Sequence, residues 1–102
     1  MTQLEFIEQI IKEKEAVILD ANDKIWSYAE LPYEETRSSA LLCSILESEG
    51  FTVETGVAEI PTAFVARYVV GTGKPVMGIL GEFDALATLS QKAGCTVKAP
   101  VQ

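Results

Sequence analysis

The sequence predicts an α/β fold in which two N-terminal helices are followed by a three-stranded sheet that includes a hairpin. Up to Gly50, apolar residues recur at the spacing of amphipathic helices. After Gly50 they alternate with polar residues or form short β-branched runs, which is typical of strands. The Gly-rich stretch GTGK, residues 71–74, lies between two of these runs and indicates a chain reversal.

Size and charge limit the classes of function. The 102 residues suit one small domain, and a hydrophobic content of 48% supports a core, although a chain of this length leaves much of its surface exposed. The net charge of -7 argues against nucleic acid or an anionic membrane as a partner, because both are bound through Lys and Arg. No apolar run approaches the roughly 20 residues of a membrane span, and acids take the place of a basic leader, so we expect a cytoplasmic protein.

The first helix is predicted over residues 3–28. Thr2 and Glu5 have the spacing of a capping box, in which each side chain accepts a hydrogen bond from the other residue's backbone. The stretch Asp20–Asp23 is the expected weak point of the helix. Its apolar stripe consists of Leu4, Ile7, Ile11, Ile18, Ile25 and Trp26.

A second helix is predicted between Pro32 and Gly50. Pro32 disfavours helical backbone at Leu31, acids lie near the start of the helix, and Gly50 marks its end. Its expected buried stripe consists of Ala40, Leu41, Ile45 and Leu46. Cys43 lies among these residues and is expected to be a small buried apolar residue, because Cys43 and Cys95 are too few for a disulfide framework.

Three strands are predicted after the second helix. Residues 51–59 and 62–70 form the first two, and the more continuously apolar residues 75–82 form a third strand expected inside the sheet. The second and third strands are predicted to form a hairpin, because the short loop between them allows only an antiparallel connection. Residues 92–102 show no periodicity and indicate a loop.

Two acids, Glu82 and Asp84, close the third predicted strand. Side chains alternate along a strand, so both carboxylates are expected on one side, where they suit a divalent cation or the support of a zinc ligand. Alternatively, they end the strand, and Asp84 serves as the N-cap of a following helix. Spacing alone leaves both interpretations open and favours the second.

Other common sites are excluded or disfavoured. The chain contains no histidine, which excludes Ser-His, Cys-His and His-rich zinc sites within these residues. GTGKP lacks the spacing of a phosphate-binding loop. Trp26, Tyr28 and Tyr33 are more typical of core packing than of a cofactor site.

Three motifs resemble the start of the catalytic domain in the M20 family of metal-dependent amidohydrolases and peptidases. They are AELPYEETRSS at 29–39, GVAEIPTAFVA at 56–66 and GEFDALATLSQ at 81–91. They are most similar to the branch that contains the p-aminobenzoyl-glutamate utilisation proteins. The resemblance covers nearly the whole chain.

The resemblance implies hydrolysis of an amide bond in aminobenzoyl-glutamate, another N-acyl amino acid or a dipeptide. It implies two divalent metal ions, zinc or manganese, that bridge a water, and a smaller lid domain that dimerises. Asp84 matches the aspartate that supports the metal centre, and Glu82 falls where many members place a histidine ligand. The catalytic role of Asp84 and the metal-binding role of Glu82 are therefore expectations from the family.

Departures from the family pattern limit what this chain does alone. Ala87 and Thr88 replace a Pro-Gly pair, which is expected to loosen the turn after Asp84. The His-Gly-Cys-Gly-His type ligand motif would lie beyond Gln102, and Cys95 does not match it. We therefore expect residues 1–102 to be the incomplete N-terminal part of one metallohydrolase catalytic domain without its lid, to bind no metal and to be inactive alone.

A different class of function stays open. The chain is alternatively a non-catalytic acidic module, derived from the same fold, that self-associates or binds a partner. Either interpretation predicts a homo-oligomer, because an unpaired strand edge and an apolar face seek partners.

Overall fold

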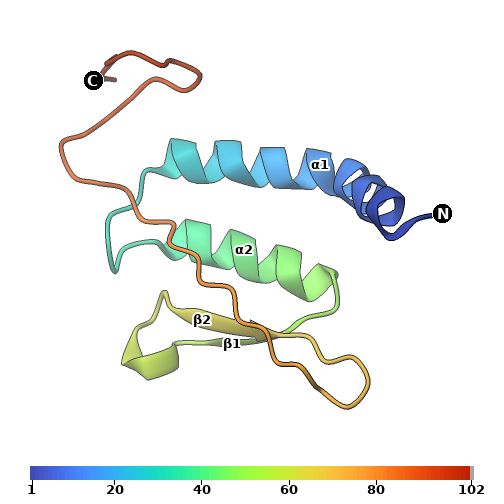
Figure 1. The fold of residues 1–102 in the computed structure, drawn as a ribbon. Coiled ribbons are helices and arrows are strands. Elements are labelled where there is room, and N and C mark those ends of the chain that lie inside the picture. The colour runs from blue at the N-terminus through green and yellow to red at the C-terminus, as the bar shows by residue number, and fades with distance from the viewer. Residues whose placement is uncertain (102) are drawn as a thin grey trace.

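The computed structural model describes residues 1–101, which contain two α-helices followed by a β-hairpin (Figure 1). The elements, in chain order, are α1 (Gln3–Tyr28), α2 (Thr36–Ser48), β1 (Thr52–Thr55), the short 3-10 helix η1 (Val57–Glu59) and β2 (Phe64–Arg67). The predicted α/β class and the order of helices before strands are confirmed. No helix in the described part of the chain is long and apolar enough to span a membrane.

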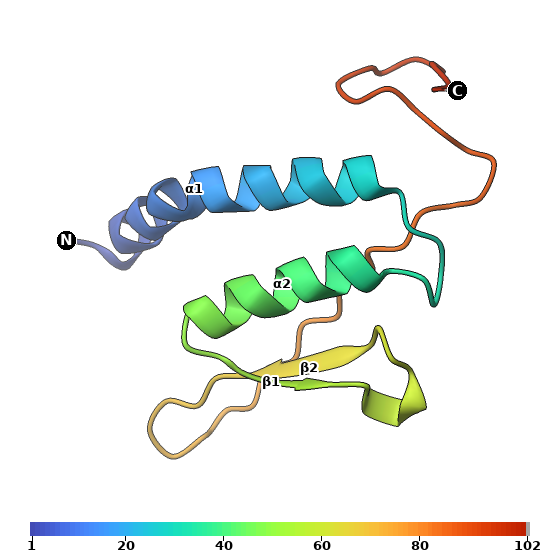
Figure 2. The same cartoon turned by 180° about the vertical axis from the view of Figure 1, so that it is seen from behind.

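The elements form three layers, with α2 in the middle. The two opposite views place α1 on one side of α2 and the hairpin on the other (Figures 1 and 2), and α2 contacts both. After β2 the chain turns and runs back along the hairpin, past α2, toward the C-terminal end of α1. The segment with the two candidate acids therefore reaches the junction of the two helices.

The first helix has the predicted bounds and the predicted cap. The backbone N–H of Glu5 donates to Oγ1 of Thr2 at 3.1 Å, and the N–H of Thr2 donates to Oε2 of Glu5 at 3.0 Å. The helix continues through the expected weak point, where Ala21 is buried and Lys24 forms an ion pair with Asp20 at 2.8 Å. Burial of Ala21 and this pair one turn apart stabilise the helix where its composition is polar.

The second helix is confirmed, but its buried face differs from the prediction. Ala40 is exposed, whereas Ser38, Ser39 and Cys43 are buried. Because α2 lies between two layers, its small residues are buried, whereas Leu41, Ile45 and Leu46 of the predicted stripe are half-buried. The predicted burial of Cys43 is confirmed.

Gly50 ends the second helix in a conformation that favours glycine. Its φ is 96°, and a Cβ added there would lie 3.2 Å from Cε2 of Tyr68. The N–H of Phe51 then donates to the carbonyl of Leu46 at 3.0 Å, which satisfies a carbonyl of the last helical turn. The stop signal in the sequence therefore has a backbone and a steric cause.

The hairpin joins the first two predicted strands. β1 and β2 are antiparallel, with Thr52 opposite Arg67 and Thr55 opposite Phe64. The N–H of Gly56 donates to the carbonyl of Ala63 at 2.8 Å and closes the connecting loop. Both strands are shorter than predicted, and β1 ends where the connecting loop begins at Gly56, whose φ is 70°.

The prediction of a third strand is wrong for the described residues, where the sheet has two strands. The chain reverses at residues 71–72 as expected, but residues 75–82 form no strand, so the predicted hairpin between the second and third strands is absent from this part of the chain. A continuously apolar strand is typical of a sheet covered on both faces. Within residues 1–101, a helical layer lies on only one side of the hairpin, so these residues contain no sheet that is covered on both faces.

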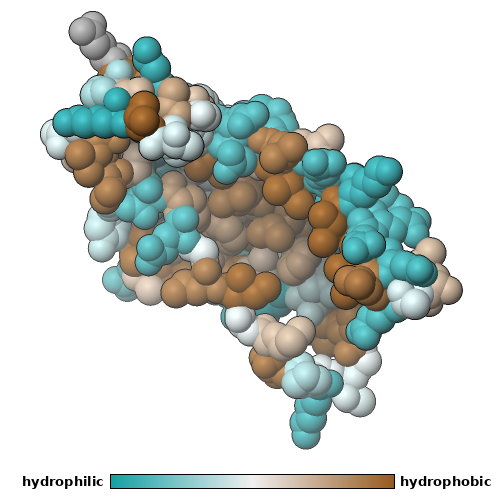
Figure 3. Space-filling view, turned by 45° about the horizontal axis from the view of Figure 1, so that its top comes forward, coloured by the Kyte–Doolittle hydropathy of each residue, from teal (hydrophilic) through white to brown (hydrophobic). Residues whose placement is uncertain are grey.

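The described structure leaves much apolar surface uncovered. Its accessible surface is 8598 Å², whereas a compact monomer of 11.1 kDa is expected to expose about 5,700 Å². Its radius of gyration is 16.4 Å, compared with about 13 Å for a compact chain of this length. Hydrophobic residues gather in the middle of one face, around a hollow (Figure 3).

Candidate functional site

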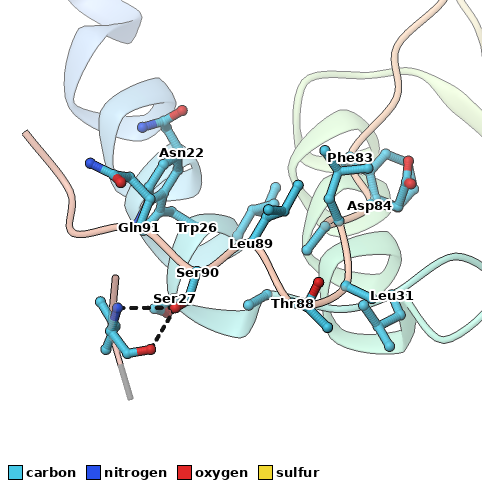
Figure 4. Close-up of a pocket in the computed structure, with 16 residues that line it drawn as sticks. Asn22, Trp26, Ser27, Leu31, Phe83, Asp84, Thr88, Leu89, Ser90 and Gln91 are labelled. Atoms are coloured by element: carbon cyan, nitrogen blue, oxygen red, sulfur yellow. Dashed lines mark hydrogen bonds between the residues drawn. The ribbon is translucent and has the colours of Figure 1, made fainter. Parts of the chain in front are cut away.

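Asp84 lies beside an open groove at the C-terminal end of α1 (Figure 4). The groove has a volume of about 960 Å³ and lies between α1 and residues 83–91. Asn22 and Trp26 line it from the helix, and Leu89 lines it from the opposite side. At its far end, the N–H of Val101 donates to Oγ of Ser90 at 3.0 Å. The groove is mostly apolar, with Asp84 as a charged residue on its wall.

Two contacts fix the chain on either side of Asp84. The backbone N–H of Ala85 donates to the carbonyl oxygen of Glu30 at 2.7 Å. The ring of Phe83 packs against the ring of Phe64 in β2, with centroids 6.1 Å apart. One contact ties the segment to the helix junction and the other ties it to the hairpin, so the position of Asp84 is set by the fold.

The Glu30 side chain holds the start of α2. Its carboxylate accepts hydrogen bonds from the backbone N–H groups of Ser38 at 2.7 Å and Arg37 at 3.0 Å. The side chain is only 8% exposed. Burial tends to raise the pKa of Glu30, but the hydrogen bonds from Ser38 and Arg37 outweigh it and lower the pKa to about 2. Glu30 is therefore a structural anion at a helix N-terminus.

An aromatic contact supports the same junction. The guanidinium of Arg37 lies 4.5 Å from the centroid of the Tyr28 ring, and its Nε lies 3.4 Å from the Glu30 carboxylate. Tyr28 is half-buried, in agreement with its predicted packing role, whereas Tyr33 and Trp26 are exposed. The junction that carries Asp84 is thus held by the end of α1 and the start of α2 together.

The two candidate acids show the alternation expected of an extended chain. Glu82 and Asp84 are exposed, and Phe83 between them is half-buried. The alternative that Asp84 caps a helix is wrong, because residues 85–91 contain a turn at 87–88 and no helix. Thr88 takes a φ of 64° in that turn, a conformation that suits glycine. The turn is therefore kept although Thr88 replaces the glycine of the family pattern.

The acid pair does not make a metal site from these residues alone. Within residues 1–101, no group of three or more His, Cys, Asp or Glu side chains is placed to hold a metal ion. A zinc ion takes about four ligands and harder cations take more. A centre that includes Glu82 and Asp84 needs donors from outside this part of the chain, and the two residue roles stay predictions.

Two known hydrolases match the chain over most of its length. It is 49% identical over 90 residues to a subunit of p-aminobenzoyl-glutamate hydrolase of Escherichia coli (strain K12), a match that covers 88% of the chain and 18% of the relative. It is 31% identical over 86 residues to thermostable carboxypeptidase 1 of Saccharolobus solfataricus, covering 84% of the chain and 22% of the relative. No family model and no solved structure matches the chain.

These relatives place the chain in a class of hydrolases that includes a peptidase. The resemblance indicated by the three motifs is confirmed: the chain belongs with the N-terminal portion of the M20-family peptidases and is similar to the p-aminobenzoyl-glutamate hydrolase subunit. The chain spans about one fifth of the length of the curated relatives that it matches.

Glu30 is the residue of this region whose role the sequence did not indicate. It lies inside the first family motif but outside α2, and the Pro-containing loop 31–35 separates it from the N–H groups that it binds. The rules for helix capping consider the residues directly before the first helical turn. For α2 they point to Glu35, which makes no side-chain cap here. The first family motif includes Glu30, but it does not indicate that the Glu30 carboxylate binds the N-terminus of α2.

Proposed function

We propose that this chain is part of a hydrolase that cleaves the amide bond of aminobenzoyl-glutamate, another N-acyl amino acid or a dipeptide. The observation that carries the proposal is the 49% identity over 90 residues to a relative named for hydrolysis of p-aminobenzoyl-glutamate. The carboxypeptidase match supports the same bond type. Because the match covers 18% of that relative, the activity is proposed for a longer protein, and residues 1–102 alone are expected to be inactive.

In this proposal, Asp84 supports a metal centre and Glu82 lies beside it as a ligand. Two structural features support the assignment: both carboxylates are exposed, and the contacts of Phe83 and Ala85 hold the segment in place. Oxygen donors of this kind suit divalent cations, and by family resemblance two zinc or manganese ions are proposed, with the remaining donors outside residues 1–101.

The direct test is an assay of amide hydrolysis with two samples. One is the 102-residue chain, and the other is the longest natural product that contains these residues. Release of aminobenzoate from p-aminobenzoyl-glutamate, or of an amino acid from N-acyl amino acids and dipeptides, is measured with zinc or manganese supplied. We expect turnover by the longer product only. Turnover of none of these substrates by the longer product would overturn the proposal.

A second candidate function is a non-catalytic acidic module that self-associates or binds a partner. The observation that favours it is the large exposed apolar surface of a chain whose net charge is -7. The two functions differ in one result: a natural product that ends at Gln102 and forms a stable assembly without hydrolase activity favours the module.

A further inference from the structure

Asp84 lies between two residues that are each held by a distant part of the chain. On one side, the ring of Phe83 packs against the ring of Phe64 in β2, with centroids 6.1 Å apart. On the other side, the backbone N–H of Ala85 donates to the carbonyl oxygen of Glu30 at 2.7 Å. Phe83 and Ala85 are half-buried. The backbone is therefore fixed on both sides of the Asp84 carboxylate.

The three motif stretches of the family contact one another in pairs. The third stretch, residues 81–91, reaches Glu30 in the first and Phe64 in the second. The first and second stretches are joined by Thr62, which is only 5% exposed and whose Oγ1 donates to the Glu35 carboxylate at 3.4 Å. All three contacts join residues of the described chain to one another, so they hold whatever further elements cover this surface.

The carbonyl group of Glu30 is held from both directions. On one side, the buried Glu30 carboxylate accepts hydrogen bonds from the backbone N–H groups of Arg37 and Ser38. On the other side, Ala29 ends α1 with a φ of 46°. A left-handed backbone at a residue other than glycine costs free energy and persists where surrounding contacts hold it. Glu30 therefore presents its carbonyl oxygen to Ala85 from a fixed junction.

We propose that Glu30 and Phe64 are positioning residues for Asp84 in the hydrolase. This inference rests on the proposed function, in which Asp84 supports the reacting centre. In this role neither residue touches substrate, and each acts through the neighbour of Asp84 that it holds. A displacement of about 1 Å caused by a distant substitution can cost about a hundredfold in rate. Loss of either contact should therefore lower kcat, and KM should stay nearly unchanged because no group that binds substrate is removed.

The first experiment removes the ring contact in the longest natural product that contains these residues. Phe64→Leu keeps an apolar side chain but loses the packing of two rings, so kcat for p-aminobenzoyl-glutamate should fall about tenfold. Phe51→Leu is the matched control, because Phe51 is also half-buried and packs against the ring of Tyr68, with centroids 5.3 Å apart. Phe51 lies at the opposite end of the hairpin from Phe64. It should lower stability similarly and keep kcat.

The partner side of the same contact provides a second variant. Phe83→Leu should lower kcat as much as Phe64→Leu does, and the double variant should lose little more, because all three lack one and the same contact. It also serves where Phe64→Leu lowers the yield of folded protein. Glu30→Gln should lower kcat at unchanged KM as well, whereas Glu34→Gln, at an exposed side chain in the same loop, should not.

Hydrogen exchange at the Ala85 amide provides a measurement that does not depend on activity. Exchange should be faster in Phe64→Leu than in the unmodified protein and unchanged in Phe51→Leu, because only the first loosens the segment that donates to Glu30.

The outcomes separate this inference from the proposed function. An active protein whose Phe64→Leu variant keeps its kcat, or loses no more than Phe51→Leu, would overturn the positioning role and leave the proposed function standing. Absence of turnover in the unmodified protein would overturn the proposed function. In that case, faster exchange at Ala85 in Phe64→Leu only would still support the placement of Asp84 by Phe64, and equal exchange in both variants would overturn it.

Discussion

The backbone N–H of Ala85 lies 2.7 Å from the carbonyl oxygen of Glu30, and this hydrogen bond fixes the chain directly after Asp84. The carboxylate of the same Glu30 binds the N-terminus of α2. One residue thus joins the end of α1, the start of α2 and the segment with the candidate acids. Its two contacts make the position of Asp84 dependent on the helix junction.

Substitution of Glu30 should destabilise the fold. Glu30→Gln keeps one acceptor oxygen but removes the charge that faces the first turn of α2, so we expect a loss of about 1 to 2 kcal/mol in the free energy of unfolding. Urea denaturation followed by circular dichroism measures it. Glu34→Gln makes the same change in the same loop at an exposed side chain and should alter stability little. Equal effects of the two variants would contradict the capping role.

The contribution of Glu30 should depend on pH in a defined direction. Its pKa lies at about 2, below the ordinary value of 4.5, because hydrogen bonds to the ionised form outweigh the effect of burial. A group whose pKa is lowered in the folded state stabilises the fold at any pH above its ordinary pKa. This contribution is lost as the pH falls toward the pKa of the folded state. The stability difference between wild type and Glu30→Gln should therefore be constant above about pH 5 and shrink toward pH 2. A difference independent of pH would count against an ionised Glu30.

Gly50 should tolerate alanine less well than Gly71 does. Both have positive φ, 96° and 67°, but a Cβ at Gly50 meets the Tyr68 ring at 3.2 Å, whereas none of the surroundings lies within 4 Å of a Cβ at Gly71. We expect Gly50→Ala to cost about 1 kcal/mol or more in thermal denaturation. Gly71→Ala should cost less, because it carries the backbone strain without the contact. A larger loss of stability in Gly71→Ala than in Gly50→Ala would show that the contact with Tyr68 is unimportant.

The two thiols should react at different rates. Cys43 is buried and Cys95 is exposed. Burial raises the pKa of the Cys43 thiol, the nearby Glu47 carboxylate raises it further, and a hydrogen bond with Ser39 opposes this rise. With a chromogenic disulfide reagent at about pH 8, Cys95 should react first and Cys43 slowly, with both fast in denaturant. A Cys95→Ser variant that keeps a fast-reacting thiol would contradict the packing of α2.

The helices were predictable from the sequence because their signals are local. The Thr2 and Glu5 capping box, the apolar spacing and the stop at Gly50 all act within a few residues, and the structure confirms the bounds of α1 and the end of α2. The absence of the third strand could not be predicted in this way, because the formation of a strand depends on partner strands that the segment itself does not specify. The exposure of Ala40 has a similar cause, since packing on both sides of α2 decides its rotation.

The candidate site was predictable in part. The alternation of exposed Glu82, half-buried Phe83 and exposed Asp84 follows from the period of an extended chain. The contacts that hold this segment, Ala85 with Glu30 and Phe83 with Phe64, join residues far apart in the chain, and no local pattern indicates them. The roles of Glu82 and Asp84 in binding metal stay predictions.

The most direct test of the account is the rate of p-aminobenzoyl-glutamate hydrolysis by the longest natural product that contains these residues, compared with its Asp84→Asn variant. We expect turnover by the unmodified protein and a loss of at least about a hundredfold in the variant, because a charge at the reacting centre is removed. Asp23→Asn makes the same change at an exposed site on α1 and should keep full activity. An Asp84→Asn variant as active as the unmodified protein would contradict the central claim.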